Sequence, residues 1–180
     1  MHKMAITKIQ SESLNLSDTY DFTGTVTGAG GQGTNFFSAR NQSTALTVNH
    51  ASLTLIPYDT EVSDVDGVFT NTASNYKFTC QTTGWHYFNA SIQWDNTLKQ
   101  QIATLFFVNG SVVPQGGFYK DRYGSNVFRN GSLPASLIYY LNANDTVQVY
   151  GYQTQTGGGS CPIVYGSDKY IWFMGYRIAQ

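Results

Sequence analysis

The chain has 180 residues and a formal net charge of −1, and only 12% of its residues are charged. This balance gives no electrostatic argument for binding nucleic acid or an anionic membrane. No apolar run approaches the roughly 20 residues of a membrane-spanning helix, so we expect no membrane insertion of that kind. The length suits one domain with a core of its own.

Aromatic residues make up 15% of the chain, and 18 glycines accompany many Asn, Ser and Thr residues. Many aromatic residues, many turn formers and few charges are typical of a β-sandwich or barrel. Helical spacing of apolar residues is absent from the sequence. The composition therefore predicts an all-β protein.

Residues 1–35 contain too few hydrophobic side chains for an independent core, and 28–35 is rich in glycine, which indicates a flexible hinge. We predict that 1–35 is a stalk or connector and that 36–180 is the compact domain. The polar sequence after Met4 shows no signal peptide. We therefore expect a fragment of a larger protein, or a chain that reaches the outside within a particle.

Short apolar runs between turn residues predict the strands of the compact domain. In chain order they are 36–40, 44–48, 52–56, 68–70, the pair 76–80 and 85–94, 101–108, 111–113, 136–141, 146–152 and 170–178. We interpret 59–67 as an acidic turn, 114–130 as a long exposed loop with one short strand, and 153–159 as a glycine-rich loop. Roughly ten short strands predict a sandwich or jelly roll.

The segment 85–94 is the strongest strand and is predicted to be central. His86, Phe88, Ala90, Ile92 and Trp94 alternate with Trp85, Tyr87, Asn89, Ser91 and Gln93. A period of two over ten residues places these sets on opposite faces. Gly84 precedes the strand where a tight turn or bulge needs a residue without Cβ.

Three predicted strands, 101–108, 136–141 and 170–178, carry bulky apolar residues on both faces. A sandwich strand needs only one apolar face, and large exposed apolar patches are rare on monomers. We infer that one sheet is covered twice, by its partner sheet and by other subunits. The alternative is cover by the 114–130 loop or the N-terminal segment. The candidates for core or subunit contacts are Phe106, Phe107, Tyr139, Tyr140, Trp172, Met174 and Tyr176.

Several motifs lie in order along 36–180. They are Phe78-x5-Gly84-x-His86-x-Phe88 with Phe69 and Asn75 before it, Asn144-Asp145-Thr146-Val147, and Phe173-x-Gly175-Tyr176-x-Ile178. This series resembles the globular-head domains of complement component one, subcomponent q, within the tumour-necrosis-factor-like jelly-roll superfamily. His86 stands where that family usually has Tyr, and no Gly-X-Y repeat precedes the domain.

The resemblance implies a ten-stranded jelly-roll sandwich, a tight homotrimer, and binding in place of catalysis. Residues 5–29 are also similar to connector segments of tailed-phage fibres. Together they predict a non-catalytic trimeric recognition head at the tip of a viral tail fibre, in the virion, which binds a host cell-surface glycan or protein. The alternatives are a structural trimerisation module of a fibre and a secreted complement-like binding protein.

The residues predicted to bind the ligand lie in the 114–130 loop. They are Phe118, Tyr119, Lys120, Arg122, Tyr123, Phe128 and Arg129. Tyr and Arg provide large contact areas with modest entropy loss, and aromatic faces suit sugar rings. The alternative is that these aromatic rings pack onto the sandwich or the trimer.

Outside the 114–130 loop, few residues are candidates for metal binding or catalysis. The acidic group Asp59, Glu61, Asp64 and Asp66 fits either a solvated turn or a calcium site made of oxygen ligands. We expect Cys80 and Cys161 to be buried free thiols, with a disulfide as the alternative. His86 is expected to pack in the core, and no sequence motif pairs a nucleophile or an acid with a base. The sequence therefore predicts no enzyme and no cofactor other than the possible calcium.

Overall fold

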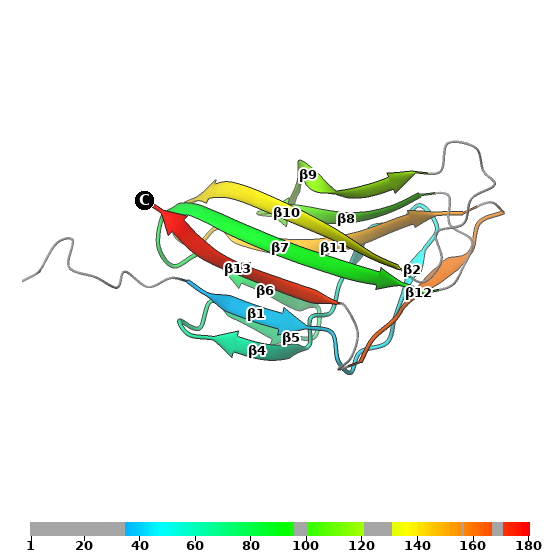
Figure 1. Ribbon diagram of the computed structural model, residues 1–180, viewed down its shortest axis with the longest axis horizontal. Coiled ribbons are helices and arrows are strands. Elements are labelled where there is room, and N and C mark those ends of the chain that lie inside the picture. Colours follow the sequence, from blue (N-terminus) through cyan, green and yellow to red (C-terminus); the bar gives the residue numbers. More distant parts are fainter. Residues whose placement is uncertain (1–34, 96–100, 121–130, 156, 167–170) are drawn as a thin grey trace, which may run out of the picture. The chain divides into compact units, whose positions relative to one another are not determined.

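The computed structural model describes residues 35–95, 101–120, 131–155, 157–166 and 171–180. All of them belong to one compact unit, Gln32–Gln180. The connector predicted for 1–35 lies outside the described residues except for Asn35. The described residues form thirteen strands and include no helix that could cross a membrane. They fold into two antiparallel sheets packed face to face, as the all-β jelly-roll prediction requires (Figure 1).

The first sheet, here called sheet A, has seven strands. Along the sheet they are β2 (Leu46–Asn49), β12 (Ser160–Ile163), β7 (Gly84–Trp94), β13 (Trp172–Ala179), β1 (Phe37–Arg40) and β4 (Thr60–Asp64), with β10 (Gly131–Leu141) on the other side of β7. In Figure 1, β10, β7, β13 and β1 lie side by side. The C-terminus lies at the same end of sheet A as the beginning of β1.

The second sheet, sheet B, has six strands. In order they are β5 (Phe69–Thr72), β6 (Asn75–Thr79), β11 (Thr146–Thr154), β8 (Gln101–Val108) and β9 (Ser111–Lys120), with the short β3 (Thr54–Leu55) also paired to β11. Consecutive strands in the chain often lie in different sheets. This crossing over is how a jelly roll closes its two layers around one core.

The central position predicted for 85–94 is confirmed, because β7 pairs with β10, β12 and β13. His86, Phe88, Ala90, Ile92 and Trp94 are all fully buried, and Trp85 is exposed. The strand begins at Gly84, whose φ is +151° and whose missing Cβ leaves room for the carbonyl of Ala179. A side chain at Gly84 would push β13 away from β7.

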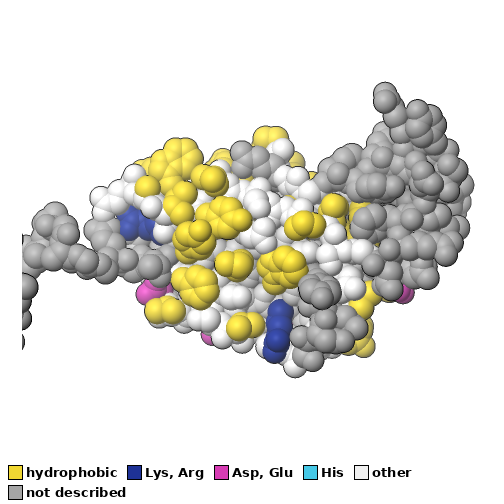
Figure 2. Space-filling view, viewed as in Figure 1, with side chains coloured by type: hydrophobic (Ala, Val, Ile, Leu, Met, Phe, Trp, Pro, Cys, Tyr) yellow, Lys and Arg dark blue, Asp and Glu magenta, His cyan; other side chains and the backbone are white. Residues whose placement is uncertain are grey.

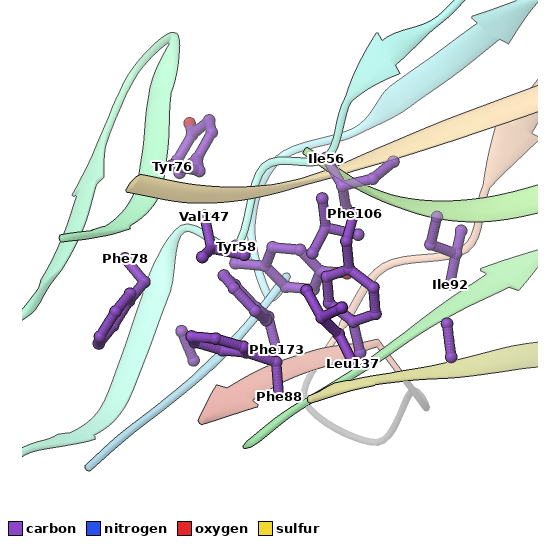
Figure 3. Packing of buried hydrophobic residues seen from close by; sticks show 14 of the residues in the cluster. Ile56, Tyr58, Tyr76, Phe78, Phe88, Ile92, Phe106, Leu137, Val147 and Phe173 are labelled. Atoms are coloured by element: carbon purple, nitrogen blue, oxygen red, sulfur yellow. The ribbon is translucent and has the colours of Figure 1, made fainter. Parts of the chain in front are cut away.

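Aromatic rings from both sheets fill the core. Phe173 of β13 lies with its ring centroid 4.8 Å from Phe37, 5.5 Å from Tyr58 and 6.3 Å from Phe106 of sheet B. Figure 3 shows Phe88, Phe173 and Leu137 of sheet A facing Phe106 and Val147 of sheet B. Offset and edge-on contacts of this kind add to the area that each ring buries.

Two turns meet at the end of the sandwich where β8 ends and β11 begins. Asn109 and Gly110 both have positive φ, 49° and 77°, which fits the type I′ hairpin that the Asn-Gly pair predicts. Asn109 donates from Nδ2 to Asp145 at 2.8 Å and accepts from the amide of Thr146 at 2.8 Å. Its side chain therefore ties the β8–β9 turn to the β10–β11 turn.

Two sequence-based predictions of strand arrangement were wrong. Segments 76–80 and 85–94 do not pair, because β6 pairs with β5 and β11 in sheet B while β7 lies in sheet A. The 59–67 segment is also not all turn, since Thr60–Asp64 forms β4 at the edge of sheet A. Edge strands tolerate the charges that made this segment look like a turn.

Several strands are longer than predicted because proline and glycine lie inside them. β9 extends from Ser111 to Lys120 through Pro114 and Gly117, and β10 begins at Gly131, before Pro134. A side chain at Gly117 would overlap the carbonyl of Pro134, so glycine allows these strands to approach closely. Cys80 and Cys161 are both buried and are not joined in a disulfide, as predicted.

Replacing Phe173 with alanine should lower the free energy of unfolding by about 3–5 kcal/mol, because the buried ring leaves a cavity among rigid aromatic neighbours. Urea unfolding followed by fluorescence measures this change. Tyr165→Ala is the matched control, since Tyr165 is 46% exposed. A Phe173→Ala loss no larger than that of the control would contradict the core described above.

Candidate functional site

Sheet A carries a cluster of aromatic and apolar side chains on the face that points away from sheet B. We call it the aromatic patch, and it consists of Trp85, Tyr87, Ile138, Tyr140 and Tyr176. Four of the five are well exposed, with Trp85 at 45%, Ile138 at 52%, Tyr140 at 43% and Tyr176 at 37%. Figure 2 shows hydrophobic side chains gathered on this side of the molecule, over β7, β10 and β13.

Strand pairing brings these side chains together. Tyr140 lies opposite Trp85, and both Ile138 and Tyr176 lie opposite Tyr87. The rings of Trp85 and Tyr140 meet edge to face at 5.5 Å, and those of Tyr87 and Tyr176 are also 5.5 Å apart. Because side chains alternate between faces, the residues between them, such as His86 and Leu137, point into the core.

A row of hydrogen bonds fixes the side chains beside the patch. The indole of Trp172 donates to Asn89 Oδ1 at 2.6 Å, and Asn89 Nδ2 donates to Ser136 Oγ at 3.0 Å. The hydroxyls of Ser136 and Tyr87 are 3.3 Å apart. The row crosses β13, β7 and β10, so this face of sheet A is ordered before any partner arrives. Preorganised side chains lose less entropy on binding.

An exposed aromatic surface of this kind is typical of a contact between proteins. Tyr and Trp are enriched at the centres of interfaces, where charged residues are depleted. None of the five patch residues is an Asp, Glu, Lys, Arg or His. The geometry of these five residues therefore fits an interface.

The seven residues predicted to lie in the core or at subunit contacts do not share one surface. Tyr140 and Tyr176 belong to the patch, and Trp172 and Met174 lie half-buried on the same face. Tyr139 lies opposite His86, on the other face of β10.

Two further candidates lie outside sheet A. Phe106 is fully buried in the core. Phe107 lies on the outer face of sheet B, 4.3 Å from the ring of Tyr150. Sequence reasoning did not name Trp85, Tyr87 or Ile138 as contact residues, although the alternation of 85–94 already placed Trp85 and Tyr87 on the second face.

The predicted ligand-binding residues lie almost wholly outside the described part of the chain. The backbone of Phe118, Tyr119 and Lys120 ends β9, but their side chains are not described. Arg122, Tyr123, Phe128 and Arg129 fall within 121–130, outside the described residues. Their role in binding stays a prediction.

Three of the four acidic residues predicted as possible calcium ligands accept hydrogen bonds from backbone amides. Asp59 accepts hydrogen bonds from the amides of Gln42, Ser43 and Thr44. Asp64 accepts from the amides of Val68 and Phe69, and Asp66 accepts from the amide of Asn35. Glu61 lies exposed on β4. No three His, Cys, Asp or Glu residues gather into a metal-binding group in the ranges that the structure describes. Calcium binding stays a prediction.

His86 is buried in the core, as predicted. Its Nδ1 lies 3.0 Å from the carbonyl oxygen of Gly84, and its Nε2 lies 3.5 Å from Asn35 Oδ1 and 3.9 Å from Cys80 Sγ. Burial raises the pKa of the Cys80 thiol, which keeps it protonated at neutral pH. A protonated buried thiol is a poor nucleophile, so this His–Cys contact does not form a reactive pair.

Comparison with known proteins supports the fold. No protein-family model matches the chain, and no curated protein matches it in sequence. Among solved structures it is similar to the Eiger tumour necrosis factor of S. frugiperda, with a TM-score of 0.57 and 11% identity over 83% of this chain and 95% of that one. It is also similar to murine APRIL, with a TM-score of 0.56 and 6% identity over 79% and 98% of the two chains.

The globular domain of zebrafish complement 1qA protein is a third similar structure. Its TM-score is 0.51, with 15% identity over 81% of this chain and 98% of that one. The fold is the jelly roll of the tumour-necrosis-factor-like and complement 1q globular domains. This confirms the fold class that the sequence motifs predicted. Identities this low establish the fold and leave function to be argued from the surface.

Asp59 should make folding sensitive to acid. Burial alone would raise the pKa of Asp59, but hydrogen bonds from Thr44, Gln42, Thr60 and Ser43 together lower it. A carboxylate whose folded pKa is depressed contributes stability above its unfolded pKa of about 3.9, and loses it as the pH falls through the folded pKa. Asp59→Asn should therefore unfold at lower urea than the wild type at pH 7, with a smaller gap at pH 3.

Glu61→Gln is the matched control for this test, because Glu61 lies nearby on β4 and is exposed. It should leave the urea midpoint nearly unchanged at both pH values. If the gap between Asp59→Asn and the wild type were equal at pH 7 and pH 3, the role of the Asp59 carboxylate would be refuted.

Proposed function

We propose that this protein is a non-catalytic recognition head that works as a homotrimer, with the aromatic patch packed around the threefold axis. The observation that carries this proposal is the exposed patch on sheet A, next to a fixed row of hydrogen bonds. A lone sandwich leaves this surface in water, whereas three copies would bury it. The resemblance of the motifs to trimeric complement-like heads points the same way.

The positions of the two ends of the described chain support a trimer in which one end joins the fibre and the other binds the partner. The first residue of β1, Phe37, pairs with Gly175, and the last paired residue of β13, Ala179, lies opposite Trp85 of the patch. The described chain therefore begins and ends at the patch end of sheet A. In three parallel copies the first described residues would lie at one common end, as a fibre or stalk requires.

The opposite end would then face the partner. β9 pairs Lys120 with Gln101, so its backbone leads toward the end of sheet B farthest from the Asn109–Gly110 turn. The predicted ligand residues Phe118, Tyr119 and Lys120 lie there. We infer that this end binds a cell-surface glycan or protein.

The setting that fits best is the tip of a viral tail fibre, in the virion. The similarity of residues 5–29 to phage connector segments supports it, and a secreted complement-like binding protein is the alternative. A purely structural trimerisation module is the second candidate function, because the aromatic patch favours self-association whether or not the head binds a ligand.

Light scattering at pH 7.5 should give about 60 kDa, as expected for three chains of 19.9 kDa. Ile138→Asp should shift the mass to that of one chain, because a trimer would bury the new carboxylate without a partner. Val65→Asp is the matched control, since Val65 is 71% exposed and lies outside the patch. A well-folded wild type that remains a single chain on dilution would overturn the trimer.

Recognition is tested separately with the intact trimer. It should bind at least one cell type or one spot on a glycan array, and the binding should saturate. Fibres that lack 36–180 should assemble and fail to adsorb if the head recognises a host. Misassembled fibres after this deletion, together with no binding by the intact head, would instead favour the structural module.

A further inference from the structure

A buried histidine lies directly behind the aromatic patch. His86 lies between Trp85 and Tyr87 on β7, and its ring points to the opposite face. Its side chain meets Asn35 before β1 and Cys80 after β6, and Arg177 of β13 lies opposite it in the strand register. The imidazole therefore contacts the first described residue of the chain and the residue that follows β6.

The neutral imidazole is well accommodated at this position. Nδ1–H donates to the carbonyl of Gly84 at 3.0 Å, which leaves Nε2 without a proton. The thiol hydrogen of Cys80 is directed to the carbonyl of Thr82 at 3.2 Å. A proton added to Nε2 would find the amide oxygen of Asn35 at 3.5 Å, which is a long and weak hydrogen bond.

The charged groups around His86 oppose a second positive charge. Arg177 of β13 is a cation that acts on the ring. From the other elements the facing titratable groups are the Cys80 thiol and the Tyr139 phenol of β10, which lies opposite His86. The negative charge of Asp145 acts on Cys80, and the same carboxylate accepts a hydrogen bond from Asn109. The carboxylate of Asp66 accepts a hydrogen bond from the backbone amide of Asn35.

We propose that His86 is a pH sensor, and that its protonation in mild acid loosens the end of the sandwich that carries the aromatic patch. The charged ring would be buried beside the positive charge of Arg177, and the groups within reach of its Nε2 are the uncharged Asn35 Oδ1 and Cys80 Sγ. Local opening of the Gly84–His86 segment would hydrate the ring. Opening there would also release Asn35, through which the preceding segment joins the domain.

The direction in which pH changes the folding stability follows from the difference in proton binding between the folded and the unfolded chain. Burial lowers the pKa of His86, the hydrogen bond to Gly84 partly offsets this, and Arg177 lowers it further. The unfolded chain therefore takes up the proton first, near pH 6.5, and folding weakens as the pH falls below that value. One such proton changes the unfolding equilibrium constant by at most tenfold per pH unit. Between pH 6.5 and 5 the change is at most about 16-fold, because the unfolded chain is already half protonated at pH 6.5.

Protonation of His86 would also affect the aromatic patch, which is the surface proposed to join the three copies. This link rests on the proposed function. Trp85 and Tyr87 flank His86, and Tyr176 flanks Arg177 on the paired strand. Loosening of these strand ends would disturb the register that brings the patch together. Acid would then raise the protein concentration at which trimers separate.

The direct test follows the His86 imidazole resonances by NMR between pH 8 and 4.5, with His50→Asn used to assign the second described histidine. The expected titration midpoint lies below 6.5. In parallel, urea unfolding at pH 7.5, 6.5 and 5 compares the wild type, His86→Asn and His50→Asn. An asparagine amide can still donate to the Gly84 carbonyl, so His86→Asn removes the titration while keeping that bond.

The folding equilibrium constants of the wild type and His50→Asn should fall by up to about 16-fold between pH 6.5 and 5, relative to that of His86→Asn. Equal pH dependence in all three proteins, or a His86 midpoint at or above 6.5, would overturn the sensor. If His86→Asn does not fold, the wild-type titration decides alone. A single-chain mass at pH 7.5 would remove the trimer and leave the pH test intact.

Discussion

The alternation of side chains along β7 is the constraint on which the rest of the structure depends. One strand must fill the core with Phe88, Ile92 and Trp94 and present Trp85 and Tyr87 on the other side. Because successive residues point to opposite faces, the outer rings cannot turn inward without moving the inner ones out. The core and the patch are therefore two sides of a single register.

Much of this architecture could be predicted from local patterns. The 85–94 alternation, the Asn109-Gly110 hairpin and the closing strand were all visible because period-two patterning and turn chemistry are local properties. Pairing is a property of distant residues, which is why 76–80 and 85–94 were wrongly paired. Glycines and prolines concealed β9 and the start of β10, since the same residues that end strands elsewhere allow close approach here.

The candidate site was harder to predict for the same reason. Of the three doubly apolar strands, 136–141 and 170–178 lie in sheet A as parts of β10 and β13, but 101–108 lies in sheet B as β8. Only the pairing of Ile138 with Tyr87 shows which residues share the patch. Phe106 and Phe107 look alike in sequence and lie on opposite sides of sheet B. The acidic residues suggested oxygen ligands, but the amides that Asp59 holds lie 15 to 17 residues away along the chain.

Because of Gly175, the positions of the last strand, β13, differ in how well they tolerate substitution. A Cβ at Gly175 would overlap the rings of Phe88 and Phe37, so any larger residue there would displace the core. Its neighbours Met174 and Tyr176 point away from that packing. Among descendants of this sequence, the packing of the core should block substitution at Gly175, whereas the core places no such limit on Met174 and Tyr176. A new specificity of self-assembly could then evolve on this strand without any cost to the folded interior.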